Sequence, residues 1–261
     1  MTADTTENKR IGLFDLTGPD AASFAQSQFS SDVKSLQPGA GQWSAWLNPQ
    51  GRVIAFFPLF RLEQDRFVAA IAFGRATEIR DRLQRFLFRS KVKLNLPTDL
   101  TLQAGANPPP DAAAQLPGPT ADHTYWLAPS TQDSPLPSLT ELQSGLPFLA
   151  SGASERFVAH ALGLKRLNAI SVNKGCYPGQ EIVARTHFLG RNKRALCSLS
   201  GVSGGEVGES VFGADRSQSV GELVWVQGDA ALAVLHSPED GMELHNLREQ
   251  QPVITRIFAD S

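Results

Sequence analysis

The sequence predicts an α+β protein with antiparallel sheets, and three observations support this fold class. Short apolar runs joined by turn residues favour β-hairpins in the first part of the chain. Apolar residues between those runs recur at helical spacing, which predicts amphipathic helices. The last quarter contains only short β-branched segments separated by glycine and polar residues, as in an all-β domain. The chain has 261 residues, which is enough for one to three domains.

A tail, a strand and a helix open the predicted order of elements. Residues 1–10 are polar, and we expect them to form a flexible tail. Residues 11–16 are a predicted strand. Gly18-Pro19-Asp20 then predicts a helix start, because proline suits the first helical position and an acidic side chain suits the helix dipole.

A hairpin and a third strand follow this helix. Residues 43–47 and 53–60 are apolar and rich in aromatic side chains. The sequence Asn-Pro-Gln-Gly at 48–51 has turn chemistry, so the two runs are predicted to pair. Residues 67–73 then form a third predicted strand.

A helix over residues 76–89 is predicted from an apolar stripe at helical spacing. Arginines at 75, 80, 82, 85 and 89 lie mostly off that stripe. Such a run of charge usually makes a solvated helix face, and a polyanionic partner or a docked client protein is the sharper alternative. Residues 92–96 alternate as a strand.

The middle of the chain is predicted to be poor in regular structure. Prolines crowd residues 107–137 and leave room for one strand, at 125–128. A short helix is predicted over 138–145, ended by glycine. Ser154 is predicted to cap a helix running to about residue 164, and residues 167–172 to form a strand.

The C-terminal domain is predicted to be all β. Six short apolar segments are separated by turns at the spacing of a sandwich or barrel; they are residues 195–202, 209–212, 221–226, 230–236, 242–247 and 253–258. Cys197 lies in the first of them, and strand alternation predicts that it is buried and structural.

The densest chemistry of the chain lies in a loop over residues 174–181. Two glycines and a proline bend the backbone before an amphipathic run, which predicts a tight loop leading into a helix. Cys176 lies on the loop with Lys174 two residues away. A cation and a helix N-terminus both favour the thiolate, which is the reactive and metal-binding form of cysteine. A small cysteine that merely fills the turn is the structural alternative.

This loop resembles the signature of the YgfZ family, folate-binding proteins related to the T-protein (aminomethyltransferase) of the glycine cleavage system. The family signature is close to K-G-C-[YF]-x-G-Q-E. Every fixed position is matched, by Lys174, Gly175, Cys176, Tyr177, Gly179, Gln180 and Glu181. The resemblance extends less specifically from about residue 11 to the end of the chain.

The resemblance implies a T-protein-like fold of two α/β lobes with antiparallel sheets, a C-terminal β-barrel and a central folate-binding channel. The implied division is a folate-binding region over 11–190 and a barrel domain over 191–261. It implies a tetrahydrofolate-dependent accessory protein in the assembly or repair of iron–sulfur clusters, which supports enzymes such as tRNA methylthiolating enzymes. Iron–sulfur client or assembly proteins would be transient partners.

The resemblance also assigns roles to residues. Cys176 and Lys174 would be the reactive pair, and Tyr177, Gln180, Glu181 and Arg185 of the signature and its continuation would lie at the folate. Arg52, after the hairpin turn, would meet the carboxylates of a folate tail, because arginine binds carboxylates in a fork geometry; an exposed, solubilising arginine is the alternative.

Two positions depart from the pattern of related proteins. Gln143 aligns with a glutamate that contacts the pterin ring in T-proteins. An amide presents donors as well as an acceptor, so this departure argues against tight folate binding of the T-protein kind. His160 also replaces a family residue, and we expect it to be a surface or hydrogen-bonded histidine. A folate-dependent C1 transferase or demethylase of the aminomethyltransferase type is the alternative function.

Composition narrows the remaining function classes. The net charge of -2 gives no general attraction to nucleic acid or membranes, and neither is an expected direct partner. Two cysteines cannot supply the four thiolates of a cluster, so no permanently bound iron–sulfur cluster is expected. Cys176, His187 and Cys197 match no standard metal site in their spacing. Without a secretory signal or a long apolar run, the expected compartment is the cytoplasm.

Overall fold

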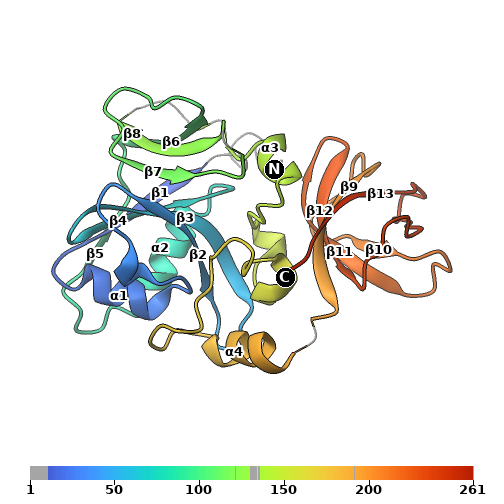
Figure 1. Cartoon of the computed structure of the whole chain (residues 1–261), viewed down its shortest axis with the longest axis horizontal. Coiled ribbons are helices and arrows are strands. Elements are labelled where there is room, and N and C mark those ends of the chain that lie inside the picture. Colours follow the sequence, from blue (N-terminus) through green and yellow to red (C-terminus); the bar gives the residue numbers. More distant parts are fainter. Residues whose placement is uncertain (1–10, 121, 130–133, 135, 191, 261) are drawn as a thin grey trace, which may run out of the picture. The chain divides into compact units, whose positions relative to one another are not determined.

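The computed structural model describes residues 11–120, 122–129, 134, 136–190 and 192–260 (Figure 1). The predicted tail over residues 1–10 therefore lies outside the described part. The chain divides into two compact units. The first contains Met1–Trp46, Ala55–Pro137 and Asn173–Pro178, and the second contains Leu47–Ile54, Ser138–Val172 and Gly179–Ser261. The predicted domain bounds of 11–190 and 191–261 stay a prediction.

The first unit is built around a five-stranded sheet in the order β2-β3-β4-β1-β5. Its elements are β1 (Gly12–Thr17), α1 (Ala21–Gln28), a 3-10 turn η2 (Val33–Ser35), β2 (Gly41–Leu47), β3 (Val53–Glu63), β4 (Arg66–Ile71), α2 (Ala76–Gln84) and β5 (Lys93–Asn95). Phenylalanines on these strands and on the turn after α1 are almost fully buried, among them Phe14, Phe29, Phe57 and Phe67. The predicted hairpin and the strands beside it are confirmed.

One prediction in this unit needs correction. Helix α2 ends at Gln84, five residues before the predicted end, and only Ala76, Ile79 and Leu83 of it are buried. Asp20 is the N-cap residue of α1, where a negative charge suits the helix dipole, and its side chain makes no capping hydrogen bond. Its carboxylate accepts a hydrogen bond from the backbone N–H of Lys91 at 2.7 Å and so ties the two segments together.

The proline-rich segment contains more regular structure than predicted. Strands β6 (Leu100–Gly105), β7 (Ala114–Pro117) and β8 (Thr124–Pro129) form an antiparallel sheet in the order β6-β8-β7. The predicted strand at 125–128 is the central β8. The prediction missed β6, which precedes the proline-rich segment, and β7, which lies at the sheet edge with its proline at its end, where a missing N–H is tolerated.

The second unit ends in a five-stranded antiparallel sheet in the order β10-β11-β12-β9-β13. Its strands are β9 (Arg194–Ser200), β10 (Ser210–Phe212), β11 (Ser219–Gln227), β12 (Ala230–His236) and β13 (Val253–Phe258). Cys197 lies in the apolar cluster of this sheet and is fully buried, as predicted. The strand order is open, with β10 and β13 at its ends, so the closed barrel remains a prediction.

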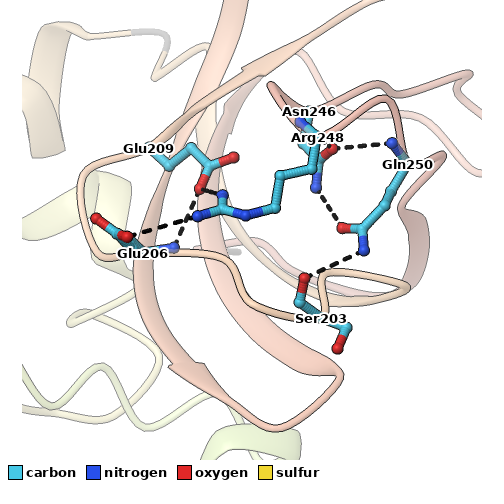
Figure 2. A network of polar contacts seen from close by, with 6 residues as sticks. All are labelled: Ser203, Glu206, Glu209, Asn246, Arg248 and Gln250. Atoms are coloured by element: carbon cyan, nitrogen blue, oxygen red, sulfur yellow. Dashed lines mark hydrogen bonds and ion pairs between the residues drawn. The ribbon is translucent and has the colours of Figure 1, made fainter.

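The predicted strand over 242–247 is wrong. His245 pairs with Phe212 through a single bridge, and the chain then turns at Asn246. The Asn246 Oδ1 atom accepts hydrogen bonds from the backbone N–H groups of Arg248 and Gln250, both at 3.0 Å. Figure 2 shows that the turn also brings the Arg248 guanidinium to the carboxylates of Glu206 and Glu209. A local asparagine turn therefore competes successfully with strand pairing.

The helices of this unit are α3 (Leu139–Gln143) and α4 (Gln180–Leu189), with short 3-10 turns η3 (Ser151–Ala153) and η4 (Ala159–Leu162). Helix α3 was predicted and begins with a capping box between Ser138 and Glu141. None of the helices in the described part of the chain has the length and apolar character needed to cross a bilayer.

The predicted helix over 155–164 and strand over 167–172 are wrong. The backbone of Glu155 and Phe157 pairs with Val53 at 2.8 and 2.9 Å, so these groups are used beside the start of β3. Ser154, the predicted cap, instead donates to the Ile54 carbonyl at 2.9 Å. Asn168 has φ 52, and the turns around it prevent a strand.

Candidate functional site

The thiol of Cys176 is exposed on the loop that precedes α4. The loop over Asn173–Pro178 belongs to the first unit. Its exposure means that a reagent or substrate can reach the sulfur without any opening of the fold. The structural alternative, a small cysteine that fills the turn, gains no support from this exposed position.

The side chain of Lys174 fastens this loop to the turn after α1. Its Nζ atom donates hydrogen bonds to the carbonyl oxygens of Phe29 and Ser31, at 2.5 and 2.8 Å. The ammonium also lies 4.9 Å from the centre of the Tyr177 ring, in cation–π geometry. These contacts hold the loop on both sides of Cys176.

Burial changes the acidity of two groups on this loop. Partial burial lowers the pKa of Lys174 to about 8, although the negative charge of Asp32 acts in the opposite direction. Burial raises the pKa of Tyr177 above its usual value. Tyr177 is only 6% exposed. Its ring therefore contributes packing to the loop, while Lys174 titrates near the physiological range.

Helix α4 begins against the hairpin turn that carries Arg52, and glycines make this contact close. Gly179 has φ +77, and a Cβ there would lie 2.7 Å from the Asn48 carbonyl oxygen and from the Gly51 Cα. A Cβ on Gly51, which has φ +71, would lie 2.7 Å from the Ile182 side chain. Both positions therefore require glycine for conformation and for space.

The hairpin turn itself is held by Asn48. Its Oδ1 atom accepts from the backbone N–H groups of Gln50 and Arg52, at 3.1 and 3.0 Å. Its amide nitrogen donates to Glu155 at 3.0 Å. Arg52 is exposed, and one of its guanidinium nitrogens donates to the Arg156 carbonyl. The rest of that guanidinium faces solvent.

The other predicted folate residues lie on two helices of the second unit. Glu181 and Arg185 are exposed on α4, and Gln180 is half-buried at its start. Gln143 is exposed at the end of α3, which packs on the C-terminal sheet through β11 and β12. The structure thus brings the hairpin turn of Arg52 into contact with the start of α4. Gln143 is not part of this contact, because its helix packs on β11 and β12.

Sequence reasoning missed the environment of His160. This histidine is only 5% exposed, and its Nε2 atom has no hydrogen-bond partner in the described part of the chain. Burial, together with the neighbouring His187 and Lys165, lowers the pKa of His160 to about 4. The rings of His160 and His187 lie 6.4 Å apart. From the sequence we expect a surface or hydrogen-bonded histidine, and this is wrong, because His160 is buried and its Nε2 atom has no partner among the described residues.

The candidate metal ligands are not assembled into a centre by the described residues. No three side chains among histidine, cysteine, aspartate and glutamate gather there as a metal site requires. Cys197 is enclosed in the C-terminal sheet, where burial raises its pKa to about 12. The predicted chemistry therefore rests on Cys176 alone as the accessible thiol of the described chain.

Comparison with known proteins supports the resemblance found in the signature. No protein-family model matches the chain. Proteins named tRNA-modifying protein YgfZ from Vibrio vulnificus and Pectobacterium atrosepticum are 25% and 29% identical over 85% and 72% of this chain, and over 77% and 68% of theirs. An uncharacterised protein of Haemophilus influenzae is 29% identical over 70% of this chain and 69% of its own. The resemblance to the YgfZ family is confirmed.

The fold resembles that of an aminomethyltransferase. The glycine cleavage system aminomethyltransferase T from Bartonella henselae matches with a TM-score of 0.65, over 97% of this chain and 85% of that chain. The sequences are 14% identical, so the match describes the fold and not the activity. It confirms the mixed fold with antiparallel sheets that the sequence predicts.

Proposed function

We propose that this chain is a tetrahydrofolate-dependent accessory protein that supports the assembly or repair of iron–sulfur clusters. Its clients would be cytoplasmic enzymes such as those that methylthiolate tRNA. The likeness to proteins named tRNA-modifying protein YgfZ supports a role linked to tRNA modification. The observation that carries the proposal is the exposed thiol of Cys176, fixed in a complete signature loop by the Lys174 hydrogen bonds.

Cys176 is proposed to act as a thiolate toward iron, sulfide or an oxidised cluster of a client. The thiolate is the form that binds metals and attacks sulfur. The cluster is cargo in this proposal, because one chain has only two cysteines and a cluster usually needs four thiolates. Lys174 positions the loop through its two carbonyl contacts, and its ammonium adds positive charge to the same loop.

The polar groups near α4 suit the carboxylate tail of a folate. Arg185 is exposed without a partner among the described residues, and Arg52 keeps part of its guanidinium in solvent. Guanidinium groups bind carboxylates with two parallel hydrogen bonds. We propose Arg52 and Arg185 as the tail contacts, with Gln180 and Glu181 in the first turn of the helix that carries Arg185. When bound, tetrahydrofolate would supply a carrier for one-carbon units.

Gln143 is the weakest member of the proposed folate set. Its side chain is an exposed amide, whereas the capping box engages the neighbouring Glu141 carboxylate. Aminomethyl transfer requires an acid or base at the reactive end of the folate. The aminomethyltransferase fold favours a C1 transferase as the second candidate function. The absence of a carboxylate at position 143 argues against it.

Deletion of the gene from its host tests the proposal. The level of methylthiolated tRNA is measured by mass spectrometry in the deletion strain and after re-expression of wild type, Cys176→Ala or Gly175→Ala. Gly175→Ala is a matched control, because an added Cβ there meets no atom within 4 Å. We expect wild type and the control to restore modification, and Cys176→Ala to fail.

Three outcomes would contradict parts of this proposal. Rescue by Cys176→Ala would reduce the thiol to a structural role. Unchanged modification in the deletion strain would exclude the pathway. Formation of methylenetetrahydrofolate from tetrahydrofolate and a methylated amine by the purified chain would identify the C1 transferase instead.

A further inference from the structure

A cationic segment connects α2 to the edge strand β5 in the first unit (Figure 1). Residues 82–98 contain five arginines and lysines and neither aspartate nor glutamate. The net charge of the whole chain is -2, so this run is a local concentration of positive charge. Such a concentration attracts polyanions even where the net charge does not.

Four of these cations are exposed and have no ion-pair partner among the described residues. They are Arg85, Arg89, Lys91 and Lys93. The fifth, Arg82, pairs with Glu78 at 3.5 Å and lies over the Trp46 ring at 5.3 Å, so it belongs to the fold of the unit. The four free cations remain available to an external anion.

Two phenylalanines are interleaved with these cations. Phe88 is 89% exposed, whereas Phe86 is 41% exposed and its ring lies edge-on to Trp46, with 6.0 Å between the ring centres. Phe88 has φ 44, a left-handed conformation that a bulky side chain rarely adopts. Burial is the usual outcome for a ring this size, and the exposure of Phe88 between Arg85 and Arg89 leaves its face open to a stacking partner.

Contacts on both sides of the exposed rings fix the course of the segment. The backbone N–H of Ser90 donates to the Leu87 carbonyl at 2.7 Å, and Lys91 N–H donates to the Asp20 carboxylate at 2.7 Å. Val92 and Leu94 are buried immediately afterwards. Asp20 is an acidic group at the segment, and its carboxylate is occupied with this backbone contact.

We propose that residues 85–93 form a binding surface for a single-stranded stretch of nucleic acid. The four free cations would contact successive phosphates, and Phe88 would stack on a base, with the exposed part of Phe86 beside it. Alternation of basic and aromatic side chains is the arrangement that recognises unpaired nucleotides, because every base has a π-face. This surface goes beyond the proposed function and is independent of Cys176. It reverses the expectation, from net charge, of no direct nucleic acid partner.

Nucleic acid suits this surface better than a membrane. An interfacial membrane segment needs a continuous apolar face with the charges on the opposite side. Here the exposed rings stand between arginines within five residues, from Arg85 to Arg89. This alternation suits a nucleic acid strand, in which the rings can stack on bases and the cations can contact phosphates.

Fluorescence anisotropy of the full chain with labelled oligonucleotides of twelve uridines or twelve deoxythymidines tests the proposal. Four phosphate contacts predict that log K falls against log salt with a slope of about −3 for a single strand. The double variant Arg85→Gln/Arg89→Gln should roughly halve that slope. Lys34→Gln/Lys193→Gln, which removes the same charge from exposed lysines elsewhere, should leave it unchanged.

Phe88→Ala tests the stacking contact separately. We expect it to weaken binding about fivefold or more without changing the salt slope. Leu247→Ala, which truncates another exposed apolar side chain, is the matched control and should bind as wild type does. Tighter binding of the uridine strand would identify RNA as the source, and tighter binding of the thymidine strand would identify DNA.

Specific outcomes would overturn the proposal. The first is that neither oligonucleotide binds at 50 mM salt. The second is that binding occurs but is weakened neither by the Arg85/Arg89 variant nor by the Phe88 variant. Binding to phosphatidylglycerol vesicles but not to oligonucleotides would assign the surface to a membrane and also overturn it. Thermal melts of all variants ensure that lost binding does not reflect unfolding.

Discussion

The two cysteines of the chain show how the same side chain takes opposite roles in two regions. Cys176 is exposed on the signature loop, whereas Cys197 is fully buried in the apolar cluster of the C-terminal sheet. Burial raises the pKa of Cys197 to about 12, so it remains a neutral thiol at physiological pH. The signature loop thus leaves the sulfur of Cys176 accessible, whereas the C-terminal sheet buries the sulfur of Cys197 among apolar side chains.

The contrast lies in what surrounds each sulfur. The loop of Cys176 is held by the Lys174 hydrogen bonds to two backbone carbonyls, by the buried ring of Tyr177 and by the close contact of Gly179 with the hairpin turn, so an exposed thiol can still have a fixed position. The two regions should therefore respond differently to thiol reagents, to substitution and to pH.

The largest expected difference is in the rate of thiol labelling. In the native protein Cys176 should react with 5,5′-dithiobis(2-nitrobenzoic acid) roughly a thousandfold or more faster than Cys197, because a buried thiol reacts only when the fold opens. Absorbance kinetics should show one fast equivalent per chain, which Cys176→Ala removes. Comparable rates for both thiols would contradict the contrast.

The next largest effect should come from the glycine that joins the loop to α4. Gly179→Ala places a Cβ 2.7 Å from the Asn48 oxygen at φ +77, and we expect a loss of about 3 kcal/mol in unfolding free energy. Gly175→Ala, four residues earlier, should change it by less than about 0.5 kcal/mol. Urea denaturation measures both, and equal effects would show that the close contact is absent in solution.

Serine substitution of the cysteines should separate the regions by a smaller amount. Cys197→Ser places a hydroxyl in an apolar cluster, where the Ala195 carbonyl is 3.8 Å from the sulfur, and should cost about 1–3 kcal/mol. Cys176→Ser should lie within about 0.5 kcal/mol of wild type. Calorimetric melts of the two variants provide the comparison, which fails if Cys176→Ser is the less stable.

The smallest expected effect is the pH dependence contributed by Lys174. Its folded pKa of about 8 lies below the ordinary 10.5, so between these values the unfolded chain binds the extra proton. Unfolding free energy should therefore rise with pH in this window, by roughly 1–2 kcal/mol between pH 8 and 9.5. Lys174→Met should lack that rise. An identical pH slope in wild type and variant would show that the lysine is not desolvated.

Much of the fold could be predicted from local signals, because strong turns and caps act within a few residues. The hairpin around Asn48, the capping box of Ser138 and the burial of Cys197 are of this kind. The sequence predicts a helix at residues 155–157, but their backbone pairs with Val53 instead. This pairing joins positions about a hundred residues apart, so no local pattern indicates it.

The candidate site was predictable only in part for the same reason. The signature identified Cys176, and its exposure follows the expectation of a reactive thiol. The Lys174 contacts with Phe29 and Ser31 could not be predicted, because they join segments 145 and 143 residues apart. The buried, unpartnered nitrogen of His160 also had no sequence signal, since nothing local distinguishes it from a surface histidine.

The Cys176→Ser variant exchanges one sulfur for oxygen at an exposed position and so tests directly whether the thiol is functional. Methylthiolated tRNA in the deletion strain carrying this variant should be measured together with the melting temperature of the purified protein. We expect less than about a tenth of wild-type modification and a melting temperature within about 2 °C of wild type. Full modification, or a loss that parallels unfolding, would contradict a functional thiol at Cys176.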